Sequence, residues 1–232
     1  VQLVPVEFDA VQPMMAALRD VWFKPYIQAT GNSLDFLKEV APKKIVLVGS
    51  PEYQNGSFKL GQAEGGRKIL LLNVNNFDAS NENELKEALH TIVHEFTHIL
   101  HQTKLFNQEY QTISTGRYNS NWTLLNDSEA RHQGFITNYA MLNKDEDFAE
   151  MVSGILVFGY EWFKDTVLAE AAKSTENPHA KADLEAKLAI VNSYFKETWN
   201  IEFFDNETSG EPGLESYFRM AIEEVVSNPP TK

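Results

Sequence analysis

Residues 90–102, HTIVHEFTHILHQ, hold four of the six histidines of the chain. Apolar residues in the surrounding segment 81–102 recur at helical spacing, which predicts one amphipathic helix. Asn81 followed by Glu84 is typical of a helix start. The four histidines fall on a stripe opposite the apolar face of this helix. That apolar face consists of Leu85, Ala88, Leu89, Ile92, Val93, Phe96, Ile99 and Leu100.

The histidine stripe contains the pattern H-E-x-x-H, formed by His94, Glu95 and His98. Side chains four positions apart on a helix lie about 6 Å from each other. Two such imidazoles can bind one zinc ion at about 2.0–2.1 Å. Glu95 would then accept a proton from a zinc-bound water. We expect the flanking His90 and His101 to be bystanders or to contact the zinc ligands from outside.

A catalytic zinc needs a third protein ligand. The chain lacks the additional histidine that metzincins carry six residues after the second motif histidine, which excludes that class. In DEDFAEMVSG (145–154), Glu146 and Glu150 lie one helical turn apart, opposite an apolar face. Glu146 is the expected ligand, and Glu150 would hydrogen-bond the outer nitrogen of a ligand histidine. A solvated acidic first turn is the alternative explanation, and Asp127 and Glu129 are weaker ligand candidates.

The composition of the chain excludes several classes of function. Its 232 residues, 43% of them hydrophobic, can bury a substantial core. The net charge of −13 argues against nucleic acid or an anionic membrane surface as a partner. Cysteine is absent, so metal ligands must be His, Asp or Glu. No apolar run reaches the roughly 18 residues of a transmembrane helix.

The first third of the chain is predicted to hold a helix and a small sheet. Gly31 would stop the helix. Gly65 and Gly66 would form the tight turn of a hairpin, because glycine adopts positive φ without strain. The predicted elements are a helix over 9–30, a buried strand over 43–50 and hairpin strands over 57–63 and 67–74.

Beyond residue 81 the pattern is almost entirely helical, apart from a polar, aromatic-rich segment over 103–126 that we expect to be an ordered loop. The fold class is therefore α+β. We expect a single domain over 1–232, with a sheet-containing part over 1–80 and a helical part over 81–232. The predicted helices cover 81–102, 127–134, 144–160, 161–173, 179–198 and 211–227.

The motif HEFTH, followed 48 residues later by EDFAE, resembles the gluzincin metallopeptidases. In those enzymes a later E-x-x-x-[DE] helix supplies the third zinc ligand and its partner. The site also resembles the anthrax lethal-factor protease domain, in which a tyrosine lies seven residues before the ligand glutamate. Tyr139 occupies that position here. The resemblance implies that Tyr139 stabilises the oxyanion or protonates the leaving amine; a packing aromatic is the alternative.

Most of the chain is similar to substrate import-associated zinc metallohydrolase lipoproteins, which are bacterial envelope proteins encoded beside outer-membrane nutrient-uptake systems. This similarity implies a zincin-like fold, bound Zn²⁺ and a periplasmic or surface location. A peptide or protein substrate and uptake components would be its partners. The chain starts at Val1 without the lipid-bearing cysteine of that family, so we expect the anchor to lie outside this sequence. The similarity rests on APKKIVLVGSPEY (41–53), AEGGRKILL (63–71), HEFTHILHQ (94–102) and EDFAEMVS (146–153).

These features favour a zinc hydrolase, most simply a peptidase. An accessory binding protein with a structural zinc is the alternative, and the intact Glu95 favours the enzyme. A self-processing or amidase-type hydrolase would share the same site. A strand within 57–74 would border the cleft and pair with an extended peptide. The aromatic side chains of Tyr110, Tyr118 and Trp122 would shape specificity or simply pack their loop.

Overall fold

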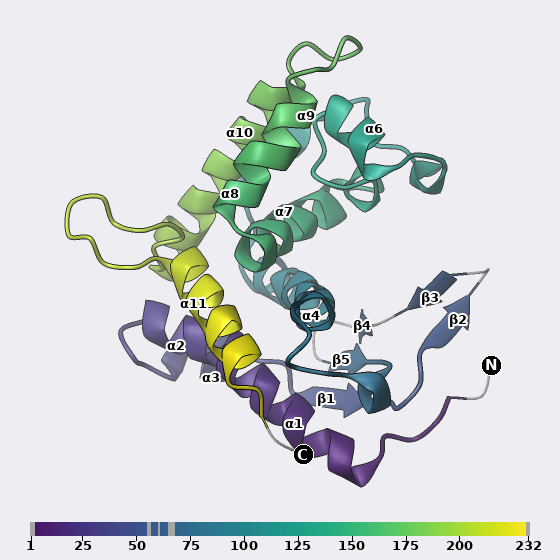
Figure 1. Cartoon of the computed structure of the whole chain (residues 1–232). Coiled ribbons are helices and arrows are strands. Elements are labelled where there is room, and N and C mark those ends of the chain that lie inside the picture. The colour runs from purple at the N-terminus through teal and green to yellow at the C-terminus, as the bar shows by residue number, and fades with distance from the viewer. Residues whose placement is uncertain (1–2, 55–56, 60, 65–67, 231–232) are drawn as a thin grey trace.

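The computed structural model describes residues 3–54, 57–59, 61–64 and 68–230. A small sheet near the N-terminus precedes a helical body, which confirms the expected α+β class (Figure 1). The helices are α1 Phe8–Leu18, α2 Lys24–Ala29, α3 Asp35–Val40, α4 Glu82–Thr103, α5 Glu109–Ile113, α6 Asp127–His132, α7 Lys144–Phe158, α8 Tyr160–Trp162, α9 Ala169–Ala171, α10 Ala180–Ser193 and α11 Leu214–Ser227. The strands are β1 Lys44–Leu47, β2 Glu52–Gln54, β3 Ser57–Lys59, β4 Gly61–Glu64 and β5 Lys68–Leu71.

Strand β5 lies at the centre of the three-stranded sheet, parallel to β1 and antiparallel to β4. The β4–β5 pair confirms the predicted hairpin, whose Gly65–Gly66 turn lies outside the described residues. The prediction of one strand over 57–63 is wrong, because β3 pairs with β2 in a separate two-stranded sheet. The predicted strand over 43–50 is present as β1, but the prediction that it is buried is wrong, because β1 is an edge strand and only half-buried.

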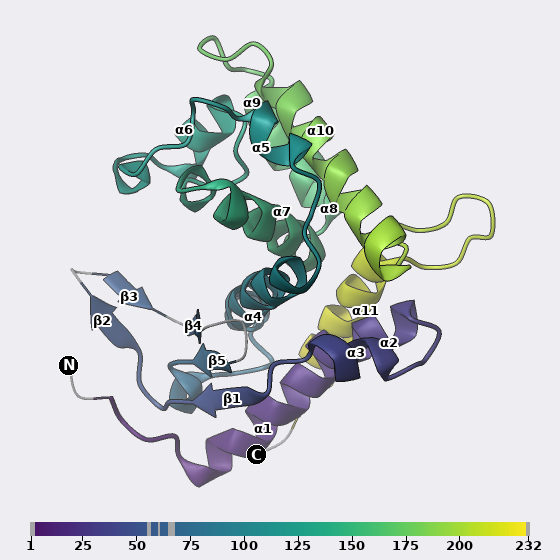
Figure 2. The same ribbon diagram turned by 180° about the vertical axis from the view of Figure 1, so that it is seen from behind.

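Helix α4 lies between the sheet and α7 and carries the whole histidine stripe (Figures 1 and 2). It begins after Asn81, whose side chain accepts hydrogen bonds from the backbone N–H groups of Asn83 and Glu84, as its sequence predicts. On the apolar face, the ring of Phe96 packs edge-on against Trp22 at 5.3 Å and Tyr26 at 5.2 Å between centroids. Every member of the predicted apolar face except the half-buried Ala88 is buried.

Trp22 and Tyr26 come from one continuous helical stretch near the N-terminus. Helix α1, the π-helical segment Arg19–Phe23 and α2 follow one another without a break, which confirms the predicted helix over 9–30. Gly31 ends this stretch in the left-handed region at φ 69°, where glycine carries no steric penalty. The apolar face of α4 therefore packs against this helical stretch.

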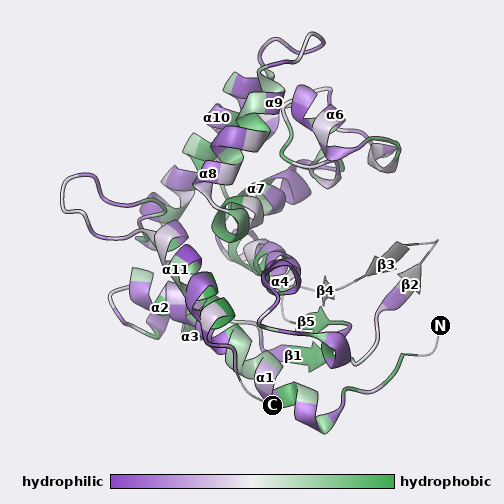
Figure 3. Ribbon diagram, viewed as in Figure 1, coloured by the Kyte–Doolittle hydropathy of each residue, from purple (hydrophilic) through white to green (hydrophobic). Residues whose placement is uncertain are grey.

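The histidine face of α4 is covered by α7 and does not open fully to solvent. Residues 147–157 of α7 are all buried, so this helix has no solvated face over that range. His94 and His101 are only 6% and 5% exposed. Figure 3 shows α7 changing from hydrophilic at its start to hydrophobic toward its end. The start of α7 is thus a polar patch inside an otherwise apolar contact between two helices.

The remaining helices follow the predicted pattern with two differences. Segments 127–134, 179–198 and 211–227 contain α6, α10 and α11 in that order, and 161–173 contains α9 and all of α8 except its first residue, Tyr160. The segment 103–126 is not simply a loop, because it includes α5 and a 3₁₀ turn over Trp122–Leu124. The short α3 was not predicted, since six residues contain too few turns to show helical periodicity. Further π-helical segments cover Phe163–Leu168 and Tyr194–Thr198, and further 3₁₀ turns cover Val74–Asn76 and Tyr139–Met141.

Candidate metal centre

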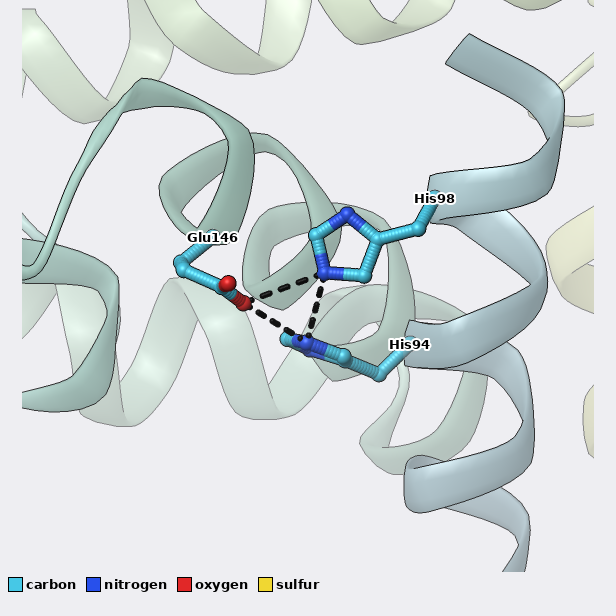
Figure 4. Close-up of side chains that lie close together, drawn as sticks. All are labelled: His94, His98 and Glu146. Carbon is cyan, nitrogen blue, oxygen red and sulfur yellow. Dashed lines mark hydrogen bonds and ion pairs between the residues drawn. The ribbon is translucent and has the colours of Figure 1, made fainter. Parts of the chain in front are cut away.

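Two imidazoles of α4 and one carboxylate of α7 meet at a single point (Figure 4). The Nε2 atoms of His94 and His98 lie 3.1 Å apart, because the two residues are one helical turn apart on the same face. Oε2 of Glu146 lies 3.0 Å from Nε2 of His94 and 3.1 Å from Nε2 of His98. The structure therefore brings together the three residues that the sequence predicts as zinc ligands.

Glu146 reaches this point because it lies in the first turn of α7. The side-chain oxygen of Asn143 accepts the backbone N–H groups of Asp145 at 2.8 Å and Glu146 at 3.1 Å. This cap fixes where the helix begins, and so directs the first-turn side chains. The positive end of the helix dipole also favours the ionised form of Glu146.

The geometry and chemistry of the three groups fit a zinc ion. Two neutral imidazoles and one carboxylate are a ligand set found in catalytic zinc sites. With bonds of 2.0–2.1 Å, ligand atoms at the corners of a tetrahedron lie roughly 3.3 Å apart. The three separations here are 3.0, 3.1 and 3.1 Å, slightly shorter than that edge. A small outward shift of each side chain would accommodate the ion.

Without a cation, the same groups hold a proton. Burial lowers the pKa of His94, but the carboxylates of Glu146 and Glu150 outweigh burial and raise this pKa to about 10. Burial raises the pKa of Glu146, but its hydrogen bonds to the imidazoles of His94 and His98 bring it far below the usual range. The centre therefore favours positive charge held between an imidazole and two carboxylates, which is the electrostatic character of a cation site.

Glu150 lies behind His94, on the side away from Glu146. Its Oε1 is 2.7 Å from Nδ1 of His94. This contact is an ion pair, but its angles are not those of a hydrogen bond. The hydroxyl of Thr137 donates to Oε2 of Glu150 at 2.7 Å. This buried carboxylate therefore takes the place that the sequence predicts for the partner of a ligand histidine.

The two flanking histidines occupy different places. Nε2 of His101 lies 2.8 Å from Nδ1 of His98, so His101 contacts an expected ligand directly. His90 does not reach the centre; its Nε2 lies 3.1 Å from the hydroxyl oxygen of Ser153 and 3.7 Å from Oε1 of Glu150. Burial lowers the pKa of His101 to about 4 and also lowers that of His90.

Glu95 follows the expected ligand His94 directly along α4, and Tyr139 lies in the 3₁₀ turn that precedes α7. Glu95 is half-exposed, and its carboxylate makes no hydrogen bond or ion pair within the described part of the chain. It is near enough to act electrostatically on both His94 and Tyr139. The ring of Tyr139 lies 5.7 Å from that of His94, and burial followed by the carboxylate of Glu146 raises the pKa of its hydroxyl. The structure thus places both predicted catalytic groups beside the expected ligands.

The weaker ligand candidates are occupied elsewhere. Oδ1 of Asp127 accepts the backbone N–H of Asn138 at 2.9 Å. Glu129 accepts the backbone N–H of Asn126 at 2.8 Å and completes a capping box at the start of α6. Both carboxylates therefore stabilise local backbone, and neither belongs to the cluster around His94.

Three aromatic residues of the 103–126 segment have different surroundings: two lie inside the protein, and one lies beside the candidate metal centre. The hydroxyls of Tyr110 and Tyr118 donate to Asp147, inside the protein. Trp122 packs edge-on against Tyr139 at 4.9 Å between centroids. Loop packing therefore accounts for the first two residues, and only Trp122 borders the centre.

The structure also contains a buried charge pair that the sequence did not reveal. Nζ of Lys187 on α10 lies 2.7 Å from Oδ2 of Asp147, and both side chains are fully buried. Nothing in the sequence distinguishes Lys187 from a surface lysine of an amphipathic helix. Asp147 directly follows the expected ligand Glu146 along α7, so its ion pair with Lys187 ties the start of α7 to α10.

The sequence pattern of the family described as "Putative zinc-binding metallo-peptidase" matches residues 1–204. The chain belongs to this family. A solved structure, described as that of a putative zinc-binding metallo-peptidase from Bacteroides caccae ATCC 43185, has the same overall fold with a TM-score of 0.76. It is 30% identical, and the alignment covers 97% of this chain and 80% of that one. No curated protein matches the chain.

The family membership confirms the resemblance to zinc-binding metallopeptidases that the motifs indicate. It agrees with the donor set found here, since the three converging groups are all zinc ligands in character. Across the described residues, no helix combines the length and apolar character needed to cross a membrane.

Proposed function

We propose that this metallopeptidase family member is a gluzincin-type zinc peptidase whose ion is held by His94, His98 and Glu146. The observation that carries the proposal is the convergence of these three groups within 3.1 Å of one another. When bound, zinc would lower the pKa of a coordinated water toward 7 and polarise a substrate carbonyl. The remaining chemistry belongs to side chains of this chain.

Glu95 is the proposed general base. Its carboxylate acts electrostatically on both His94 and Tyr139, and it makes no hydrogen bond or ion pair with another described group. It can therefore accept a proton from the attacking water and later deliver that proton to the leaving amine. A purely structural zinc site has no use for such a carboxylate, so the position of Glu95 supports an enzyme over an accessory binding protein.

Tyr139 is the proposed stabiliser of the tetrahedral intermediate. Its pKa is raised, so the hydroxyl keeps its proton at neutral pH and remains a hydrogen-bond donor. The ring is held between Trp122 and His94. A donor held in place before reaction stabilises the negative charge that develops on the carbonyl oxygen.

Strand β4 is the proposed binding edge for substrate. It is the outer strand of the order β1–β5–β4 and lies beside α4 (Figure 1). An extended peptide could add to this edge through backbone hydrogen bonds. A location in the bacterial envelope as an outer-membrane lipoprotein, next to nutrient-uptake components, is part of the proposal and rests on the resemblance alone.

A peptide-library digest followed by mass spectrometry tests this function. We expect zinc-loaded wild type to cleave, and Glu95→Gln to keep its zinc while losing at least about 10²–10⁴-fold in turnover. Tyr139→Phe keeps the ring contacts, so it should lose less, and mainly in kcat. If wild type and both variants give the same digest, the accessory-protein alternative replaces the peptidase.

A further inference from the structure

His101 is a buried imidazole that the proposed mechanism does not use. It lies on α4 three residues after His98 and is 5% exposed. Its Nε2 is 2.8 Å from Nδ1 of His98, a normal hydrogen-bond distance. The contact joins His101 to the nitrogen of His98 that faces away from the metal centre.

The direction of this hydrogen bond follows from the orientation of His98. Nε2 of His98 faces Glu146 and His94, so it is the nitrogen that would bind zinc. A ligating nitrogen must be unprotonated, and a neutral imidazole then carries its proton on the other nitrogen. Nδ1 of His98 is therefore the donor, and Nε2 of His101 is the acceptor.

We propose that His101 is a positioning residue: it selects the tautomer of His98 and fixes its ring angle for zinc binding. This inference rests on the proposed function, because it assumes that His98 is a zinc ligand. Metal-bound histidines generally need such a partner on their second nitrogen.

The ring of His101 is itself held by aromatic packing. It meets Phe106 edge-on at 5.5 Å and Phe148 at 6.2 Å between centroids. Phe148 follows Glu146 by two residues on α7, and it stacks flat on Phe106 at 4.2 Å. Helix α7, which carries the proposed ligand Glu146, therefore also holds in place His101, the hydrogen-bond acceptor of His98.

The two ligand histidines are supported by chemically different partners. Glu150, a carboxylate, contacts His94, whereas a neutral imidazole accepts from His98. Glu95, Glu146 and Glu150 already place three carboxylates around the centre. An imidazole acceptor orients His98 without adding a fourth negative charge, and so leaves more positive charge on the ion to polarise a substrate.

The first test uses the wild-type chain, labelled with ¹⁵N and loaded with zinc. We expect nuclear magnetic resonance to show His98 protonated at Nδ1 and coupled through the hydrogen bond to Nε2 of His101. A His98 proton on Nε2, or an Nδ1 proton with no coupling to His101, would overturn the proposal. This measurement needs no variant and does not depend on peptidase activity.

The second test measures zinc affinity by competition with a chelator. His101→Phe keeps a ring in the aromatic pocket but removes the acceptor, so we expect a loss of roughly 10- to 100-fold. His101→Gln restores an acceptor oxygen and should recover part of that loss. The exposed His179→Gln is the matched control and should leave the affinity unchanged.

The outcomes separate this inference from the proposed function. If wild type binds zinc and His94→Ala does not, while both His101 variants match wild type, the positioning role is excluded and the metal centre stands. If wild type itself binds no zinc, the proposed function fails first. The far-ultraviolet circular dichroism and unfolding midpoint of each metal-free variant show whether a lost affinity reflects lost structure.

Discussion

Three consecutive acidic residues of α7 have three different surroundings, because each step along a helix turns the side chain by about 100°. Asp145 forms a partly exposed ion pair with Lys144. Glu146 faces the imidazoles of α4. Asp147 is fully buried against Lys187. Their roles therefore follow from direction around the helix axis and not from charge.

Replacing Glu146 and Asp145 in turn tests which of the two carboxylates binds zinc. We expect Glu146→Ala to lose most of its zinc at micromolar metal, because it removes one of three ligands. Asp145→Ala is the matched control and should bind zinc like wild type. Inductively coupled plasma mass spectrometry after gel filtration measures both. Full zinc content in Glu146→Ala would exclude this residue as the third ligand.

The protonation of His94 predicts how zinc binding depends on pH. In the metal-free protein its pKa is raised to about 10, so the imidazole is protonated at pH 7. Zinc must displace this proton, and zinc affinity should therefore fall as the pH decreases below about 10. Calorimetry in buffers of different ionisation enthalpy should detect release of about one proton from His94 at pH 7.

Glu150→Gln is the control for this pH effect. It removes one of the carboxylates that raise the pKa of His94, so the pH at which proton release falls to half of its maximum should be lower than in wild type. The same half-release pH in wild type and Glu150→Gln would contradict the assignment of the proton to His94.

At the scale of secondary-structure elements, α7 is held at its start by several neighbours. Helices α5 and α10 both pack beside it (Figure 2). The hydroxyl of Tyr110 donates to the backbone oxygen of Asp147 at 3.0 Å, and Nζ of Lys187 donates to the backbone oxygen of Gly134 at 2.8 Å. Burial raises the pKa of Asp147 and lowers that of Lys187, while their mutual attraction opposes both changes.

Breaking the Asp147–Lys187 pair should destabilise the protein strongly. Asp147→Ala leaves a fully buried ammonium group without its counter-charge, which costs about 3–5 kcal/mol. The double variant Asp147→Ala with Lys187→Met removes both charges and should recover part of the loss. Urea unfolding of the metal-free protein measures these free energies. Lys181→Ala, in an exposed pair with Glu185, should change stability by at most about 0.5 kcal/mol.

At the scale of the whole molecule, the proposed zinc site joins α4 to α7. Helix α4 contacts the sheet, and α7 contacts α5, α10 and α11. An ion bound between these two helices would link the helix that contacts the sheet to the rest of the helical body. Zinc that binds only the folded state would stabilise that state by about 2.7 kcal/mol when the free zinc concentration is 100 times Kd.

Zinc should therefore raise the unfolding temperature, and a chelator should reverse the effect. Differential scanning calorimetry with and without zinc measures the shift. His98→Ala should show no shift, since it lacks one of the three proposed ligands drawn in Figure 4. An equal shift in His98→Ala would mean that zinc acts somewhere else on the protein.

The sequence by itself determined the features that depend on spacing along one helix. The i and i+4 separation of His94 and His98, the Asn81 cap and the apolar face through Phe96 all follow from helical geometry and lie in α4 as expected. The later E-x-x-x-E pattern was enough to select Glu146 and Glu150 as candidates. Spacing also allowed His101 to face His98, but it could not show which nitrogen the ring would present.

Only the tertiary structure decided how separate helices meet. It selected Glu146 over Asp127 and Glu129, whose carboxylates cap backbone groups instead. It buried Lys187 beside Asp147, and it paired β3 (57–59) with β2 instead of placing it in the predicted hairpin. These contacts join residues far apart in the chain, and their free energy depends on burial and on partners that no local pattern contains.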